Sequence, residues 1–212
     1  MTNFGKYDVD EGVTPDTEWV TATPIEPPAR CTVLPGPDDD LHTFPNGGNR
    51  YERVDGSLVV SPPPTPDHQR VISRLLVILN DAATLGLEPL PGVGVRAGEG
   101  CFHIPDLVVV PERACESAPL APGDVLLAVE VVGPHTRTFD GASKVLSYAA
   151  AGIPVYWRVE PDEGPTLYVY ELDDDSYKGP VAHEAGTTAT LSAPYPVSFD
   201  PAVLVAPRSS KP

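Results

Sequence analysis

Residues 124–132, DVLLAVEVV, decide the fold class of this 212-residue chain. After its first position the run is almost continuously apolar, which is typical of a central strand buried on both faces of a sheet. Glu130 interrupts the run. A buried carboxylate without a partner is costly in free energy, so Glu130 needs a cationic side chain or a metal ion beside it. The same segment therefore predicts a central strand and marks a candidate functional site.

Helices and further strands flank this run on both sides. The sequence YERVDGSLVV (51–60) predicts a hairpin around Asp55-Gly56, and an apolar period of 3.6 from Asp67 predicts a helix that ends near Gly86. Further elements are expected as strands at 93–96, 105–111, 155–160 and 166–172, two weaker strands within 177–192, and a second helix at 139–151. This order favours an α/β fold in which a helix packs on each side of a mixed sheet.

The two ends of the chain differ in composition from the body. Residues 1–40 hold nine acidic and two basic residues, many prolines and no sustained period, so 1–42 is expected to be an acidic, proline-rich tail. Residues 43–205 form the expected single domain, and 206–212 a short polar end.

Charge and cysteine content limit the function classes. The net charge of −16 argues against a protein that binds nucleic acid constitutively through a basic face. It does not exclude an enzyme that acts on nucleic acid, because net charge does not fix the local field of a site. Cys31, Cys101 and Cys115 are scattered and predict free thiols in a reducing cytoplasm. The polar N-terminus and the lack of a run of about 18 apolar residues predict neither secretion nor a membrane span.

Asp106 is the second candidate acid, because it opens the apolar run PDLVVVP directly after Pro105. On neighbouring strands, Asp106 and Glu130 would repel unless a cation lay between them. Hard oxygen ligands of this kind suit Mg²⁺ or Mn²⁺. The alternative for Asp106 is that it caps a loop. The alternatives for Glu130 are that it points to the open end of the sheet or pairs with an arginine such as Arg137 or Arg158.

Lys144, Glu52 and His68 each allow two interpretations. Lys144 follows Asp140 by four residues, so it could form a surface ion pair or direct its ammonium towards the metal site. Glu52 could be a third acid of that site or a charge of the hairpin. His68, in the first turn of the first helix, could be catalytic or a packing residue.

Three segments resemble the Uma-two-type family of endonucleases, a bacterial branch of the restriction-endonuclease-like PD-(D/E)XK superfamily. The segments are YERVDGSLVVSPPPTPDHQR (51–70), PDLVVVP (105–111) and VEVVGPHTRTFDGASKVLSYAAAGIPVYWRVEP (129–161). The resemblance covers about 43–205. It implies an α-β-β-β-α-β core with an N-terminal hairpin and a C-terminal β extension.

The resemblance also implies roles for individual residues. Asp106 and Glu130 match the two acids of the family motif. Val132 stands where the wider superfamily has lysine, so Lys144 of the following helix is expected to supply that group. Glu52 and His68 match positions that commonly hold the same residue types.

The function expected from this resemblance is Mg²⁺-dependent (or Mn²⁺-dependent) endonuclease activity on nucleic acid, with DNA as the expected substrate. Asp106, Glu130 and the backbone carbonyl of Val131 would hold the metal, and Lys144 would position the attacking water. A homodimer is expected by analogy, since cutting a duplex benefits from two centres. Two alternatives stay open: a catalytically silent module that binds protein, which the charge of −16 favours, and a hydrolase of a small phosphate compound.

Overall fold

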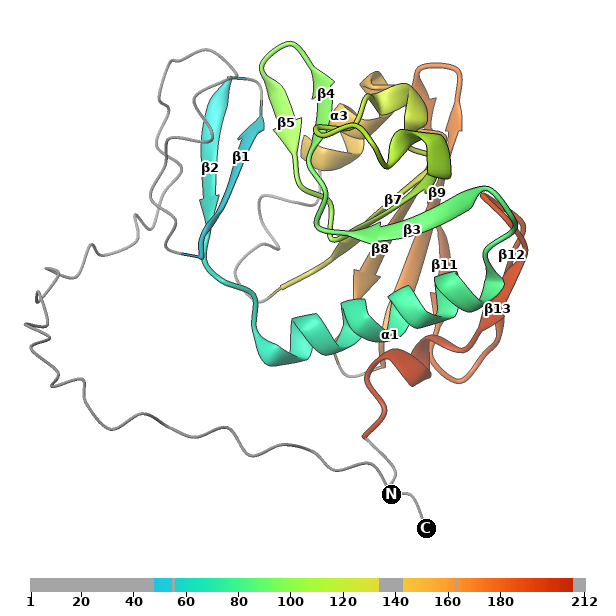
Figure 1. Cartoon of the computed structure of the whole chain (residues 1–212). Coiled ribbons are helices and arrows are strands. Elements are labelled where there is room, and N and C mark those ends of the chain that lie inside the picture. The colour runs from blue at the N-terminus through green and yellow to red at the C-terminus, as the bar shows by residue number, and fades with distance from the viewer. Residues whose placement is uncertain (1–47, 55, 134–142, 163, 208–212) are drawn as a thin grey trace, which may run out of the picture.

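The computed structural model describes residues 48–54, 56–133, 143–162 and 164–207. Its main sheet has seven strands in the order β10-β9-β8-β7-β6-β3, with β11 paired to β9 (Figure 1). The strands are β3 (Leu87–Pro91), β6 (Leu107–Pro111), β7 (Leu127–Val131), β8 (Val155–Glu160), β9 (Thr166–Asp173), β10 (Ser176–Tyr177) and β11 (Val181–Glu184). β7 is buried throughout, antiparallel to β6 and parallel to β8, so it is the predicted central strand.

The two α-helices of the described residues cover opposite faces of this sheet. α1 (Pro66–Ala82) buries the apolar stripe predicted for it, Val71, Ile72, Leu75 and Leu79. Successive residues of β7 alternate between the faces: Val129 packs in the apolar cluster under α1, and Ala128 packs in the cluster that holds Tyr148 of α3 (Ser143–Ala150). By the same alternation, the side chain of Glu130 lies on the α3 face of the sheet, where its carboxylate is buried.

A second, smaller sheet has the strand order β2-β1-β5-β4. Its strands are β1 (Arg50–Val54), β2 (Ser57–Ser61), β4 (Val95–Gly98) and β5 (Cys101–His103). β1 and β2 form the predicted hairpin, and Gly56 in its turn has φ +74, which glycine tolerates without strain. This sheet brings β1 close to the start of β6, where Asp106 lies.

The C-terminal extension completes the core beneath α1 (Figure 1). β12 (Ala189–Leu191) pairs with β13 (Val197–Phe199), and the short 3-10 helix η4 (Pro201–Leu204) follows. Its buried side chains join the cluster of α1 and β7: Ala189, Leu191, Tyr195, Val197, Phe199 and Leu204. The extension is therefore part of the folded domain.

The element order α1-β3-β6-β7-α3-β8 confirms the expected α-β-β-β-α-β core, but the first of its three strands was wrongly predicted. It is β3, and the segment 93–96 instead leads into β4 of the smaller sheet. β3 contains Pro89 and Pro91, which normally argue against a strand. It lies at the edge of the main sheet, where a residue without an N–H is tolerated.

Other boundaries shift by a few residues. α1 ends at Ala82, and Gly86, with φ +86, forms the turn into β3. α3 is described from Ser143, so the predicted helix start at 139–142 lies outside the described residues. β5 and β13 were not predicted. The predicted tail 1–42 and most of the polar end 206–212 also lie outside the described residues.

No helix in the described ranges is long and apolar enough to cross a membrane.

Candidate active site

Asp106 is fixed by bonds to three separate elements. It precedes β6 and is buried, and its Oδ2 accepts a hydrogen bond of 2.8 Å from the backbone N–H of Val131 in β7. Its Oδ1 accepts one of 2.8 Å from the guanidinium of Arg50 in β1. The Nε2 of His68, in the first turn of α1, lies 3.2 Å from Oδ2. Burial alone would raise the pKa of Asp106, but the hydrogen bond from His68 and the charge of Arg50 outweigh it and lower the pKa to about 2.

Glu130 has the cationic partner that a buried acid requires. Its Oε1 accepts hydrogen bonds from the ammonium of Lys144 at 2.9 Å and from the phenol of Tyr148 at 2.6 Å. Burial and the nearby carboxylate of Glu130 hold the pKa of Tyr148 well above its ordinary value, so the phenol stays protonated and donates. Of the alternative partners, Arg158 pairs with Glu160 at 2.8 Å, and Arg137 lies outside the described residues.

Lys144 lies inside the site. Only 4% of the residue is exposed, and its ammonium lies 3.2 Å from Oε1 of Glu52 as well as beside Glu130. Glu52, in β1, also accepts a hydrogen bond of 2.9 Å from the backbone N–H of Ile104. The burial of Lys144 contradicts the alternative of a surface ion pair, and its two bonds show that Glu52 belongs to the same cluster.

His68 faces two oxygen atoms at once. Its Nε2 lies 3.0 Å from the carbonyl oxygen of Val131 and 3.2 Å from Oδ2 of Asp106. Both oxygens can only accept, so Nε2 carries the proton. Burial by itself favours the neutral imidazole, but the hydrogen bond to Asp106 and its charge outweigh this and raise the pKa of His68.

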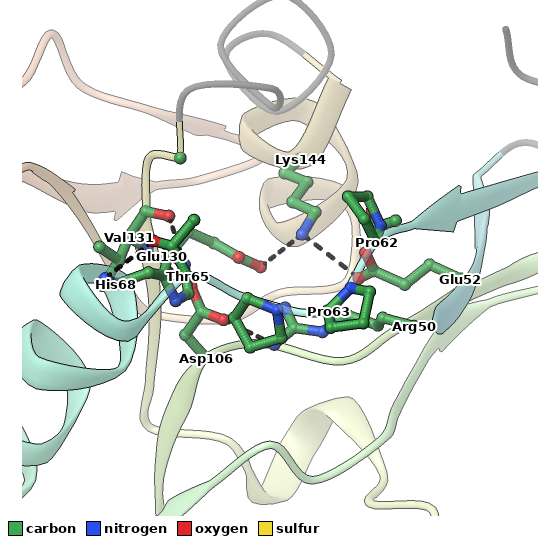
Figure 2. Close-up of a pocket in the computed structure, with 13 residues that line it drawn as sticks. Arg50, Glu52, Pro62, Pro63, Thr65, His68, Asp106, Glu130, Val131 and Lys144 are labelled. Carbon is green, nitrogen blue, oxygen red and sulfur yellow. Dashed lines mark hydrogen bonds and ion pairs between the residues drawn. The ribbon is translucent and has the colours of Figure 1, made fainter. Parts of the chain in front are cut away.

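These side chains line one pocket of about 70 Å³ (Figure 2). Pro62, Pro63 and Pro64, which follow β2, also line it. The five residues singled out from the sequence, together with the carbonyl of Val131, all contribute to it: Glu52, His68, Asp106, Glu130 and Lys144. A larger hollow, of about 500 Å³, adjoins it and shares Thr65, His68 and Gly133 with it. The pocket thus joins α1, β1, β7, α3 and the start of β6.

The pocket contains oxygen atoms of the kind that a hard divalent cation prefers. Asp106 and Glu130 supply carboxylates, and the Val131 carbonyl converges with Asp106 Oδ2 on one point, held by the N–H of His68. Across the described parts of the chain, no group of three or more His, Cys, Asp or Glu side chains is arranged to hold a metal ion. A cation here would therefore need the backbone carbonyl and water to complete its coordination, as Mg²⁺ commonly does.

Arg50, Tyr148 and His103 also belong to this region and were not singled out from the sequence. Arg50 stands two residues before Glu52 in a strand, and Tyr148 stands four residues after Lys144 in a helix. These spacings place Arg50 on the same face of its strand as Glu52, and Tyr148 on the same face of its helix as Lys144. The sequence therefore does contain a signal for both residues. His103, whose Nε2 lies 2.7 Å from Ser147 Oγ, carries no comparable signal.

The fold and this cluster of acids with a buried lysine define a restriction-endonuclease-like α/β protein. A family model described as "Uma2: Putative restriction endonuclease" matches residues 38–204, and the chain belongs to this family. A crystal structure of a DUF820 protein from Anabaena variabilis ATCC 29413, titled a putative nuclease, shares the fold with a TM-score of 0.61 and 17% sequence identity. The match covers 76% of this chain and 90% of that one. No curated protein matches.

Proposed function

We propose that this protein is a divalent-metal-dependent nuclease that hydrolyses phosphodiester bonds of nucleic acid, with DNA as its substrate. One observation carries the proposal: Asp106, the Val131 carbonyl and Glu130 meet in a single pocket beside the buried ammonium of Lys144. Membership of a family described as putative restriction endonucleases supports it.

The cation would be held by Asp106, Glu130 and the Val131 carbonyl. When bound, Mg²⁺ or Mn²⁺ supplies a water of lowered pKa and neutralises charge on the scissile phosphate. The chain itself fixes these oxygens beforehand. The N–H of Val131 holds Asp106 Oδ2 at 2.8 Å, and Tyr148 holds Glu130 at 2.6 Å. Neither carboxylate then has to reorganise when the substrate binds.

Lys144 would orient the attacking water and stabilise the charge that develops on the phosphate. Its ammonium has three donors, and two of them are directed to Glu130 and Glu52 at 2.9 and 3.2 Å. These two acids hold the ammonium in one position. In this proposal Glu52 is a positioning residue for Lys144.

His68 would leave the metal position when the cation binds. Its Nε2 donates to the two oxygens that the cation would take, so its imidazole would compete with the cation for them. The raised pKa of His68 favours the charged imidazolium, which would offset the charge of Asp106 until the cation binds. We assign it this role, and no acid–base step.

The deciding experiment is a titration with Mn²⁺ or Mg²⁺ that compares wild type with Glu130→Gln on single-stranded and duplex DNA and on RNA. Wild type should cleave only with the metal, and Glu130→Gln should neither bind the cation tightly nor cleave. Cleavage by the variant at the wild-type rate would refute the proposal.

A catalytically silent, protein-binding member is the second candidate, and the net charge of −16 favours it. It predicts no metal-dependent cleavage of any nucleic acid by wild type.

The small volume of the pocket, about 70 Å³, also makes a small phosphodiester a useful test substrate. Bis(p-nitrophenyl) phosphate turned over in place of DNA would show a hydrolase of small compounds.

A further inference from the structure

We infer that Arg50 is a catalytic residue of this site, and that its guanidinium takes the place of a second metal ion, so that one divalent cation per chain is sufficient. The inference rests on the proposed function above and deepens it. Three observations support it. The two oxygens of Asp106 have different partners, Arg50 has hydrogen-bond donors that Asp106 does not use, and the charge of the pocket suits a single divalent cation.

The two oxygens of Asp106 have different partners. Oδ2 is directed to the Val131 N–H and to His68, on the side of the proposed cation. Oδ1 is held by the Arg50 guanidinium at 2.8 Å (Figure 2). In sites with two metal ions, the ions lie about 3.5–4 Å apart and clamp the attacking and leaving oxygens together. Here the far oxygen of Asp106 already has a permanent cation, so a second ion would have to displace it.

Arg50 also has hydrogen-bond donors to spare. A guanidinium carries five N–H groups in a planar fork, and within the described part of the chain Asp106 is the only hydrogen-bond partner of the Arg50 side chain. The side chain lines the pocket and is 25% exposed, so a ligand in the pocket can reach it. The fork matches the oxygens of a phosphate, which is why arginine serves so often at phosphoryl groups.

The charge of the pocket supports a single divalent cation. Its described lining holds three carboxylates (Glu52, Asp106 and Glu130) against the two cations Arg50 and Lys144. One divalent ion would bring this set to about +1, which balances the single negative charge of a phosphodiester, whereas two ions would bring it to about +3. His68 adds at most one further charge to either sum. Arg50 thus supplies the positive charge that a second ion would otherwise provide.

Counting bound Mn²⁺ by isothermal titration calorimetry and by electron paramagnetic resonance tests the inference without relying on activity. Wild type should bind one Mn²⁺ per chain. Arg50→Gln removes a positive charge beside the ligands and frees Oδ1, so it should bind Mn²⁺ at least as tightly or admit a second ion. Its kcat should nevertheless fall about 10²–10³-fold, the usual effect of removing one donor that stabilises transition-state charge. Arg50→Lys, which keeps the charge but not the fork, should recover part of this loss.

Arg113→Gln is the matched control, because Arg113 also pairs with a carboxylate, Asp124 at 3.1 Å, but is largely exposed. It should change neither the Mn²⁺ count nor kcat. Two Mn²⁺ per wild-type chain would refute the inference and leave the proposed nuclease intact. An Arg50→Gln variant that cleaves like wild type would also refute the inference. So would a variant that loses Mn²⁺ and activity together, because that result would indicate a purely structural role. A wild type that cleaves nothing would refute the proposed function instead, and the Mn²⁺ counts of wild type and Arg50→Gln would still decide whether Arg50 excludes a second ion.

Discussion

The ammonium of Lys144 lies between two buried carboxylates, 2.9 Å from Glu130 and 3.2 Å from Glu52. Each of these charges depends on the others, since a buried ion that loses its partner keeps its desolvation cost without the compensating attraction. A substitution at this residue therefore tests both the chemistry and the stability of the site. Measuring cation binding separates the effect on chemistry from the effect on stability.

We expect Lys144→Met to abolish metal-dependent cleavage while leaving Mn²⁺ affinity unchanged or higher. The lysine is not a ligand, and its removal takes a positive charge away from the cation. Because Glu130 and Glu52 then lose their buried partner, the free energy of unfolding measured in urea with EDTA should fall by about 3–5 kcal/mol. Mn²⁺ should restore part of this loss.

Lys178→Met is the control for the loss of a lysine as such. Its Nζ lies 3.6 Å from Asp173 and the side chain is 61% exposed, so the change should stay within about 0.5 kcal/mol. Asp106→Asn should differ from both by losing metal and activity together. If Lys144→Met cleaves like wild type, the catalytic role of Lys144 has to be abandoned.

At the scale of the element, the start of α1 places His68 in the site. Thr65 precedes the helix with extended backbone, Pro66 occupies its first turn, and the Thr65 hydroxyl accepts a hydrogen bond of 3.3 Å from the His68 N–H. This cap fixes the first turn, and with it the direction of the imidazole towards Val131. The prolines 62–64 before it allow no regular structure that could shift the helix start.

Thr65→Ala should lower the free energy of unfolding by about 0.5–2 kcal/mol, because it leaves a helix N–H without its cap. Thr65→Ser should keep most of the stability. Urea unfolding followed by circular dichroism measures both. The control Ser73→Ala removes a hydroxyl that bonds to Gln69 O within the exposed face of α1, and it should change stability by less than about 0.5 kcal/mol. Equal losses for Thr65→Ala and Ser73→Ala would contradict the capping role.

At the scale of the whole molecule, the C-terminal extension and the N-terminal tail are expected to contribute differently. The extension buries Tyr195, Val197, Phe199 and Leu204 against α1, and the Tyr195 hydroxyl donates to Leu79 O at 2.9 Å. The composition of residues 1–40 offers little apolar surface to bury. The stability of the domain should therefore depend on the C-terminal extension and not on residues 1–40.

Leu204→Ala should cost about 2–5 kcal/mol, since Leu204 is fully buried beneath α1 and its truncation leaves a cavity. The adjacent Val203 is 43% exposed, and Val203→Ala should cost much less. Denaturant unfolding of the two variants makes a matched comparison. A loss below about 1 kcal/mol for Leu204→Ala would show that the extension is only loosely attached.

Limited proteolysis should remove residues 1–40 without changing the melting temperature of the remaining domain. The family match begins at residue 38, so most of the predicted tail lies outside it. Differential scanning calorimetry of intact and trimmed protein checks the expectation. A drop of several degrees on trimming would mean that these residues dock onto the domain.

The sequence by itself determined the central strand and the two helices of the described residues, and it marked Asp106 and Glu130 as candidate acids. A strand buried on both faces requires a continuous apolar run, and a helix buried on one face requires apolar residues at a period of 3.6. Both patterns can therefore be recognised from consecutive residues. A carboxylate inside such a run stands out for the same reason. This is why Asp106 and Glu130 could be named in advance.

Only the tertiary structure decided which groups neutralise those acids and which strand stands at the edge of the sheet. Arg50 reaches Asp106 from a different sheet, and His68 reaches it from a helix. Such pairings depend on how distant elements pack, which no local pattern records. Likewise β3 is a strand despite Pro89 and Pro91, because an edge position leaves one side of its backbone without a pairing partner. Local order follows from neighbouring residues, whereas the charge balance of this site follows from the assembly of five separate elements.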